Sequence, residues 1–363
     1  MSLKLAKLFG QGLGRDRLVR VLLLLDLATS NNWGGVQTMT RTLQLVLQDH
    51  GFVVKALAWQ HTNFSDLLHA ARQSDVVVAS HNFGPTYCGV ALKVLTRKPL
   101  VSWVHGPLLD VLKMSKASWW KRLWLSHVYR YVNLFICVSK TTEDSLLGFL
   151  STSSVKILRT AVIPNGLTPF EDHADNIPLV ANTSYTNLFI GYVGRLSEEK
   201  RPHLLLDTLR YLPLDTQLCI VGDGNLRAEL EDAGKELIVN ERLKFLGHQA
   251  SSHGLYSPYQ VTLLTSQFEG CPMTALESLS CGVPCVALPI PAMRELFEHD
   301  APYLLADDET PQALAIAVLN LSHIPVERVQ EDTARIMDKH SLRRFGNSWQ
   351  SILFDLLSAS LRA

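Results

Sequence analysis

The sequence predicts an α/β protein with two doubly wound parallel-sheet domains that face a cleft. Three features support this prediction: a length of 363 residues, short apolar runs that alternate with helical patterns, and a polar interruption after which the alternation restarts. A chain of this length is too long for one hydrophobic core and suits two domains of ordinary size. Apolar residues make up 47% and charged residues 19%, as is typical of a globular protein.

The first half contains five apolar runs of strand length, and helical patterns such as 37–48 and 118–131 lie between them. Runs that are buried on both faces and joined by helices predict a parallel sheet with helices on each side. We therefore expect an N-terminal domain over residues 1–168. Its predicted strands are 20–27, 53–59, 75–80, 100–105 and 134–138.

A polar stretch rich in Pro, Asp, Asn and Thr then predicts a linker over residues 169–187. A second domain is expected over 188–340. A C-terminal helix over 341–363 is predicted to pack back on the N-terminal domain. The strands expected in the second domain are 188–193, 217–221, 243–246, 261–265 and 284–288, with one more at 301–305.

Charge and cysteine usage restrict the class of protein. Lys plus Arg and Asp plus Glu balance at 34 each, which disfavours a globally basic nucleic-acid binder and leaves a local basic patch open. The six cysteines lie mostly in or beside apolar runs, without a Cys-x-x-Cys pair, so reduced thiols in the cytosol are expected. The apolar run 18–27 has only ten residues and contains Arg20 and Asp26, too short and too charged to span a membrane.

Two carboxylates form the strongest chemical signal, in the segment Glu269-Gly-Cys-Pro-Met-Thr-Ala-Leu-Glu277. The segment follows the predicted strand 261–265 and runs into a helix, whose first position suits Pro272. The N-terminus of such a helix offers free N–H groups to an anion, and carboxylates beside it can accept hydrogen bonds from sugar hydroxyls. Taken alone, this segment also has a purely structural interpretation. In it, Glu269 is an ordinary loop charge and Glu277 is an N-terminal helix acid that complements the helix dipole.

Two cations flank the next strand-to-helix turn, in Gly194-Arg195-Leu-Ser-Glu-Glu-Lys200 after the predicted strand 188–193. Arg contacts phosphate oxygens bidentately and Lys acts as a point charge, so the pair can clamp a diphosphate. The alternative is a solvated turn in which Glu198 and Glu199 balance the cations.

Two weaker signals lie in the N-terminal half. Gly34 and Gly35 follow the first predicted strand and would let a backbone approach a phosphate closely, although a tight turn explains them equally. His105 ends the predicted strand 100–105 at the same cleft, where it can hydrogen-bond or act as an acid or base. A purely structural histidine is the alternative.

Two other patterns are incomplete. Gly222-Asp-Gly224 follows a strand and opens a helix, but Arg227 stands where a dinucleotide fingerprint needs its third glycine. The sequence also contains no Asp-x-Asp pair, the usual carboxylates of a metal-bridged nucleotide sugar. Neither a dinucleotide oxidoreductase nor a transferase of that metal-bridged kind is therefore expected.

In this order, and each at the end of a predicted strand, the signals resemble the large retaining glycosyltransferase family 4, which has the GT-B architecture of two Rossmann-like domains. The resemblance covers most of the chain, and the ordered set is far more specific than any one element. It favours the functional interpretation of each signal. Further matching segments are Ser139, Ile163-Pro164-Asn165-Gly166, Phe245-Leu246-Gly247 and Cys281-Gly282-Val283-Pro284.

The resemblance implies a retaining, metal-independent sugar transfer from a nucleotide-diphosphate sugar, with a UDP-sugar favoured and GDP-mannose as the alternative. The acceptor would be a saccharide or lipid-linked molecule in surface polysaccharide or glycolipid synthesis. No cofactor is implied besides the nucleotide-sugar co-substrate. The alternative function is a non-catalytic nucleotide-sugar-binding subunit of a transferase complex, which would be expected to lose one of these charged residues.

The resemblance also assigns roles. Arg195 and Lys200 would hold the diphosphate and stabilise the departing nucleotide, with the backbone of Gly34 and Gly35 in support. Glu277 would contact the ribose. The implied catalytic residues are His105, Arg195, Lys200 and Glu269; the sugar would also meet Cys271, Met273 and Thr274, and the base would meet Gly222, Phe245 and Leu246. Family members often have an aromatic residue at the position of Cys271, so the resemblance implies a differently shaped sugar pocket here.

The stretch from Leu112 to Tyr131 combines five cations and five aromatic residues without an acid. Basic residues interleaved with tryptophan suit the interface of an anionic bilayer. We therefore predict a cytoplasmic protein that is peripheral on the inner face of the cell membrane, with no nucleic-acid partner. The alternative is an ordinary helix with Trp124 and Tyr131 in the core. The cations are Lys113, Lys116, Lys121, Arg122 and Arg130, and the aromatic residues are Trp119, Trp120, Trp124, Tyr129 and Tyr131.

Overall fold

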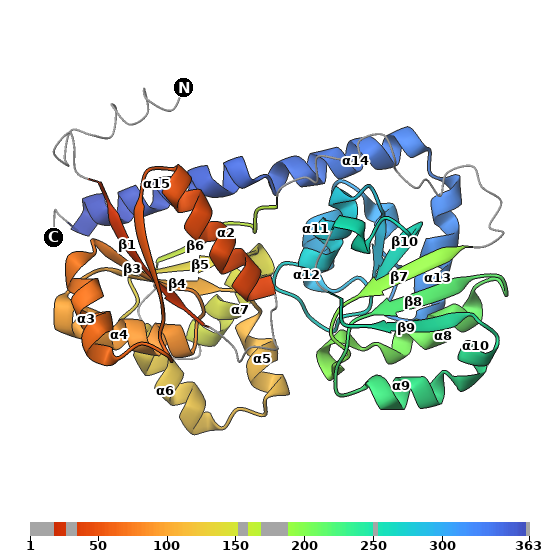
Figure 1. Ribbon diagram of the computed structural model, residues 1–363, viewed down its shortest axis with the longest axis horizontal. Helices are drawn as coiled ribbons and strands as arrows, with labels where there is room; N and C mark the ends of the chain where they lie inside the picture. Colours follow the sequence, from red (N-terminus) through yellow and green to blue (C-terminus); the bar gives the residue numbers. More distant parts are fainter. Residues whose placement is uncertain (1–17, 27–34, 152–158, 168–187, 250–252, 361–363) are drawn as a thin grey trace. The chain divides into compact units, whose positions relative to one another are not determined.

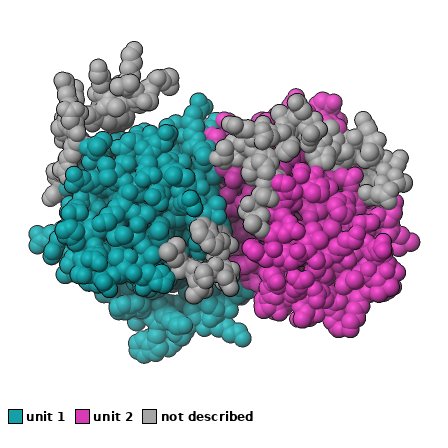
Figure 2. Space-filling model, viewed as in Figure 1, with its two compact units in different colours: residues 1–166, 342–363 teal, residues 167–341 magenta. Residues whose placement is uncertain are grey.

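A computed structural model describes residues 18–26, 35–151, 159–167, 188–249 and 253–360. The chain divides into two compact units, one formed by residues 1–166 and 342–363 and the other by residues 167–341 (Figure 2). Each unit contains one parallel β-sheet with helices packed on it (Figure 1). The predicted fold class of two parallel-sheet α/β domains is confirmed. The predicted linker 169–187 lies outside the described residues.

The first unit contains a six-stranded parallel sheet in the order β2-β1-β3-β4-β5-β6. Every residue of the inner strands β3, β4 and β5 is buried, because helices cover both faces of the sheet. The strands are β1 (Arg20–Leu25), β2 (Val53–Ala58), β3 (Val76–Ala79), β4 (Leu100–Val104), β5 (Leu134–Cys137) and β6 (Arg159–Val162). The helices are α2 (Gly35–Asp49), α3 (Phe64–Gln73), α4 (Gly84–Thr96), α5 (Leu108–Met114), α6 (Trp119–Tyr129), α7 (Lys140–Ser151) and α15 (Leu342–Ser360).

The C-terminal helix α15 belongs to this first unit, although the chain of the second unit comes before it. Its Trp349 is fully buried and meets the ring of Trp103 on β4 edge-on, with 5.2 Å between the centroids. Gly346 faces α2 so closely that an added Cβ would lie 2.4 Å from the His50 ring. The helix is thus part of the core of the first unit.

The second unit contains a five-stranded parallel sheet in the order β11-β10-β7-β8-β9. Its strands are β7 (Phe189–Val193), β8 (Gln217–Val221), β9 (Leu243–Gly247), β10 (Val261–Leu264) and β11 (Cys285–Ala287). Its α-helices are α8 (His203–Tyr211), α9 (Arg227–Ala233), α10 (Lys235–Val239), α11 (Met273–Ser280), α12 (Pro291–Phe297), α13 (Pro311–Asn320) and α14 (Val326–Lys339). Short 3₁₀ helices occupy Glu198–Lys200, His253–Leu255, Pro302–Leu304 and Leu321–His323.

Three details differ from the prediction. The segment 301–305 contains a 3₁₀ helix over Pro302–Leu304 and one isolated bridge from Leu305 to Ala287, because Pro302 lacks the N–H that a ladder needs. The strand β6 was not predicted. Pro272 precedes α11 as its N-cap instead of occupying the first helical position.

Candidate active site

In the second unit, the predicted donor-binding residues lie at or after the carboxyl ends of β7, β8, β9 and β10. Parallel strands end at one edge of the sheet, which is where ligands bind in open α/β sheets. Arg195 and Lys200 follow β7, and Gly222 follows β8. Glu269 follows β10 in a loop and Glu277 lies on α11, as the sequence predicted.

The loops that follow β7 and β8 cross at very short range. Gly222 has a φ of +140°, and a Cβ added there would lie 1.8 Å from the carbonyl oxygen of Gly194. A Cβ at Gly224 would lie 2.2 Å from the carbonyl oxygen of Leu196. Backbone hydrogen bonds fix this crossing, since Leu196 donates to Asp223 at 3.0 Å and Leu226 donates to Leu196 at 3.1 Å. These glycines therefore hold the loop that carries Arg195.

Arg195 presents its side chain to solvent. The side chain is 69% exposed, and its Nη2 lies 3.2 Å from Glu199 Oε1. The Tyr192 hydroxyl donates to the Arg195 carbonyl at 2.9 Å, which fixes the backbone beneath the guanidinium. The guanidinium is thus exposed to solvent beside Glu199, while its backbone is held in place.

Lys200 and Glu269 form a partly buried ion pair between two different loops. The two side chains are 20% and 13% exposed. Glu269 Oε1 also accepts a hydrogen bond from the Ser266 hydroxyl at 2.6 Å, and the Thr265 hydroxyl donates to the Lys200 carbonyl at 2.7 Å. The predicted phosphate ligand and the predicted sugar ligand are therefore direct neighbours.

The sequence interpretation missed Arg201, which stabilises the same region. Its Nε donates to the Thr265 carbonyl at 2.9 Å and its Nη2 donates to the Ser266 carbonyl at 2.8 Å. The backbone of Arg201 is left-handed, with a φ of 46°. In the sequence, only its position directly after Lys200 pointed to Arg201. Its left-handed backbone and its contacts to a loop more than 60 residues away leave no local sequence pattern.

Glu277 is held by a second residue that the sequence did not indicate. The buried Tyr256 hydroxyl donates to Glu277 Oε2 at 2.6 Å. Burial raises the pKa of the Glu277 carboxyl, and the hydrogen bond from Tyr256 lowers it in part. The carboxylate is thus oriented by Tyr256 in a poorly solvated position in the middle of α11.

The remaining predicted donor residues differ in exposure and direction. Cys271 and Met273 are partly buried and pack against the core of the second unit, with Thr274 also half-buried in the first turn of α11. Phe245 packs on the core with the Arg227 guanidinium 5.9 Å from its ring centroid, whereas Leu246 is 44% exposed. Successive strand residues face opposite sides, so Phe245 and Leu246 do not share a surface.

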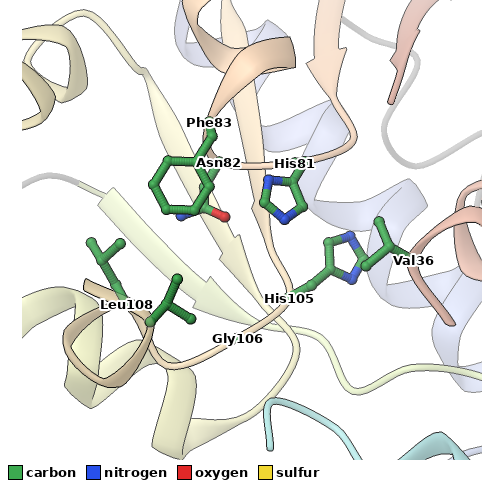
Figure 3. A pocket seen from close by; sticks show the side chains of 8 residues that line it. Val36, His81, Asn82, Phe83, His105, Gly106 and Leu108 are labelled. Atoms are coloured by element: carbon green, nitrogen blue, oxygen red, sulfur yellow. The ribbon is translucent and has the colours of Figure 1, made fainter. Parts of the chain in front are cut away.

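His105 lies directly after β4 and lines a pocket of about 180 Å³ in the first unit (Figure 3). Its Nε2 lies 3.0 Å from the Ser80 carbonyl. A carbonyl only accepts, so Nε2 carries the proton and Nδ1 is left as an acceptor. Burial, helped by nearby His81, lowers the pKa of His105 to about 3, so the ring is neutral at neutral pH. The pocket is lined by Val36, His81, Asn82, Phe83, His105, Gly106, Leu108 and Val111.

His81 is a pocket residue that the sequence interpretation did not single out. Its ring is nearly parallel to that of His105, with 6.3 Å between the centroids and 14° between the planes. Burial lowers the pKa of His81, while the charge of Asp26 raises it in part. The position of His81 after β3 was the available signal. Of the two predicted glycines, Gly34 lies outside the described residues and Gly35 opens α2 beside Val36.

Within the described part of the chain, no three His, Cys, Asp or Glu side chains gather as they would around a metal ion. Likewise, none of the described helices is long and apolar enough to cross a membrane.

Two parallel-sheet α/β units, with cations and carboxylates at the strand ends of the second, define a glycosyltransferase of the GT-B class. Comparison with known families agrees with this class. The model described as "Glycosyl transferases group 1" matches residues 178–337, and the model described as "Glycosyltransferase Family 4" matches residues 51–169. The chain belongs to the group 1 and family 4 glycosyltransferases.

Known relatives are distant. An uncharacterized glycosyltransferase of Methanocaldococcus jannaschii is 24% identical over 261 residues, which cover 67% of this chain and 65% of the relative. A lipopolysaccharide 1,6-galactosyltransferase of Escherichia coli is 38% identical over 102 residues, or 26% of this chain and 28% of the relative. The matches thus span less than two thirds of these relatives' length.

Among solved structures, the Anabaena protein Alr3699/HepE in complex with UDP-glucose is similar to this chain, with a TM-score of 0.72 and 20% sequence identity. The similarity covers 92% of this chain and 99% of that chain. At this identity the similarity establishes the shared fold.

Proposed function

We propose that the chain is a retaining glycosyltransferase that moves a sugar from a nucleotide-diphosphate sugar, preferably a UDP-sugar, to a saccharide or lipid-linked acceptor. The observation that carries this proposal is the grouping of Arg195, Lys200, Glu269 and Glu277 at one edge of the second sheet. Support for the UDP-sugar comes from Alr3699/HepE, which binds UDP-glucose with the same fold. Support for a lipid-linked acceptor comes from the lipopolysaccharide galactosyltransferase.

Arg195 and Lys200 are proposed to bind the donor diphosphate. The exposed Arg195 guanidinium can contact two phosphate oxygens at once, and Lys200 supplies a second positive charge from a less hydrated position. Negative charge grows on the diphosphate as the bond to the sugar breaks, and fixed cations stabilise that charge. Two side-chain cations at this place support transfer without a metal ion.

Lys200 and Glu269 are proposed to exchange partners when the donor binds. A phosphate oxygen would take over the Lys200 ammonium, and the released Glu269 carboxylate would accept hydrogen bonds from the sugar hydroxyls. Without the donor each charge neutralises the other, so neither is left unpaired in a partly buried place. Glu269 Oε1 is engaged by Lys200 and Ser266, which suits a hydrogen-bonding role better than attack on the sugar.

His105 is proposed to contact the donor sugar from the first unit. Its ring is neutral and offers Nδ1 as an acceptor to a sugar hydroxyl. Glu277, oriented by Tyr256, is proposed to accept hydrogen bonds from the ribose hydroxyls. In the proposed transfer, the acceptor attacks the sugar from the same face that the nucleotide leaves, and the anomeric configuration is therefore retained.

The proposal is tested by thermal shift with UDP-, GDP- and ADP-sugars, each with and without EDTA. We expect selective stabilisation by a UDP-sugar that persists in EDTA and is lost in Arg195→Ala/Lys200→Ala. The anomeric configuration of the product, measured by NMR, tests retention. Binding without transfer to any acceptor would instead indicate a non-catalytic nucleotide-sugar-binding subunit.

We also propose a cytoplasmic location, peripheral to the inner face of the cell membrane. A nucleotide-sugar donor and a lipid-linked acceptor would meet at that surface. The exposed basic and aromatic residues between Leu112 and Tyr131 support this location. Fractionation of cells would test it, with the protein expected in the membrane pellet at low salt and in the supernatant at high salt.

A further inference from the structure

The first turns of α6 and the segment between α5 and α6 project from the body of the first unit (Figures 1 and 2). We propose that this projection, residues 113–124, is a docking surface that inserts into the interface of an anionic phospholipid bilayer. The docking itself does not depend on the proposed sugar transfer.

Large apolar side chains cover the projection. Trp119, Trp120 and Trp124 are 61%, 63% and 61% exposed, and Leu123 between them is 56% exposed. The rings of Trp119 and Trp120 stack with 3.5 Å between their centroids. Soluble monomers rarely expose such a continuous apolar patch, and tryptophan is the side chain favoured at the boundary between water and lipid.

The second half of α6 anchors the projection. Leu125, Val128 and Tyr129 are buried in the core of the first unit. The Tyr129 hydroxyl donates to the Asn82 carbonyl at 2.9 Å and accepts from Asn82 Nδ2 at 3.0 Å. The alternative that places Trp124 and Tyr131 in the core is wrong, because these side chains are 61% and 41% exposed.

The charges around the projection favour an anionic partner. Between residues 76 and 139 the sequence contains eight Lys or Arg residues and a single acid, Asp110, whereas the whole chain is neutral. Among the described residues, none of the eight is ion-paired with an acid. The eight are Lys93, Arg97, Lys98, Lys113, Lys116, Lys121, Arg122 and Arg130.

The same charges decide which partner fits. Two copies of this surface packed face to face would bring like charges together, which disfavours a second copy of the chain as the occupant. An anionic bilayer attracts each basic residue near its surface by about fivefold in partitioning and accepts the tryptophans at its interface. Lys93, near the end of α4, adds to this field, since its ammonium donates to the carbonyl of Tyr131, just after α6, at 2.6 Å.

Docking would also bring the pocket of the first unit close to the bilayer. The helix α5 contributes Leu108 and Val111 to the wall of that pocket. Its other side chains include Leu109 and Met114, which are 37% and 39% exposed, and Met114 is already part of the projection. We therefore infer that the acceptor is lipid-linked; this second step rests on the proposed function, whereas the docking does not.

Vesicle flotation of the full chain tests the docking. We expect binding to vesicles of equal parts phosphatidylcholine and phosphatidylglycerol, weak binding to phosphatidylcholine alone, and release by salt. Two sets of substitutions should each lower the bound fraction by at least about tenfold, without changing the thermal midpoint. They are Trp119→Ser/Trp120→Ser/Trp124→Ser and Lys113→Glu/Lys121→Glu/Arg122→Glu.

Matched controls test whether the effect depends on the position of the substituted side chains, because they change similar side chains outside the projection. Leu214→Ser/Val239→Ser removes two side chains that are 84% and 80% exposed in the second unit, and it should leave flotation unchanged. A second control, Arg41→Glu/Lys55→Glu/Arg72→Glu, reverses three exposed cations elsewhere in the first unit. It should lower the vesicle-bound fraction by less than half as much as Lys113→Glu/Lys121→Glu/Arg122→Glu does.

Three results would overturn the docking: no flotation on anionic vesicles, equal loss in the controls, or a dimer that dissociates in the tryptophan variant. Transfer to a water-soluble saccharide that is faster than transfer to the same saccharide on a lipid would overturn the inference about the acceptor. Loss of transfer to both acceptors with flotation intact would count against the proposed function and leave the docking standing.

Discussion

Lys200 in the second unit is ion-paired with Glu269 and 20% exposed, whereas Arg122 in the first unit is exposed and has no acidic partner among the described residues. Paired and partly buried charges hold a fixed geometry, which suits a small anionic ligand that takes over one partner. Unpaired and hydrated charges act over a longer range, which suits attraction to an extended anionic surface. The number of charges is therefore less informative than whether each one is already neutralised.

The largest expected effect tests the donor side of this comparison. Arg195→Ala/Lys200→Ala removes both cations from the diphosphate, and we predict that the rate of transfer falls by about 10³-fold or more. Steady-state kinetics with a UDP-sugar would measure it. The paired surface cations of the same unit, in Arg210→Ala/Lys235→Ala, serve as the control and should leave the rate within twofold. A double variant that kept a tenth of the activity would exclude the diphosphate clamp.

The next effect concerns the crossing that holds Arg195. Gly222→Ala would place a Cβ 1.8 Å from the Gly194 carbonyl oxygen at a φ of +140°, so the two loops must move apart. We predict a loss of about 2–4 kcal/mol in the free energy of unfolding, seen as a lower thermal midpoint. Gly254→Ala is the matched control, because an added Cβ there meets no atom within 4 Å. Equal midpoints for the two variants would contradict the prediction.

The inner strands and most site positions could be predicted from the sequence because their signals are local. β1, β3, β4 and β5 are apolar runs apart from Arg20 at the start of β1 and Ser102 within β4, since parallel strands are buried on both faces. β6 was missed because it lies at the sheet edge, where its Arg-Thr-Ala-Val sequence is only half-buried. An edge strand covered on fewer sides leaves a weaker pattern.

The pairings within the site could not be predicted, because they depend on which strands are neighbours. Lys200 and Glu269 are 69 residues apart and meet because β7 pairs with β10. Tyr256 reaches Glu277 across 21 residues without any local motif. The opposite directions of Phe245 and Leu246, in contrast, follow from strand alternation and could have been foreseen.

A smaller effect is expected when the poorly solvated Glu277 carboxylate is replaced by the neutral amide of glutamine. Burial raises the pKa of Glu277 above its usual value of 4.5, so the folded state binds the proton more tightly than the unfolded state does. The charged carboxylate therefore destabilises the fold at neutral pH, and this penalty disappears as the pH falls through the raised pKa and below 4.5. We predict that Glu277→Gln raises the thermal midpoint at neutral pH, with no gain in acid.

The same substitution should weaken donor binding about tenfold, because a neutral amide is a poorer acceptor for ribose hydroxyls than a carboxylate. Thermal midpoints across pH and titration calorimetry with UDP would measure the two effects. Tyr256→Phe is the companion variant: it removes the hydrogen bond that lowers the pKa of Glu277, so its midpoint should fall at neutral pH. A Glu277→Gln protein that is less stable at neutral pH and binds UDP normally would contradict both parts.

The smallest effect is expected at an ion pair that is exposed and far from the donor loops. Lys140 lies 2.7 Å from Glu143 and 2.9 Å from Asp144 in the first turn of α7, and its side chain is 59% exposed. Water screens such pairs, and a cation at a helix N-terminus opposes the helix dipole, so the two contributions largely cancel. We predict that Lys140→Ala shifts the thermal midpoint by less than about 1 °C. A shift in the midpoint as large as that of Gly222→Ala would contradict this prediction. It would show that an exposed ion pair can stabilise the protein strongly, so that partial burial would not set the Lys200–Glu269 pair apart from the pairs of Lys140.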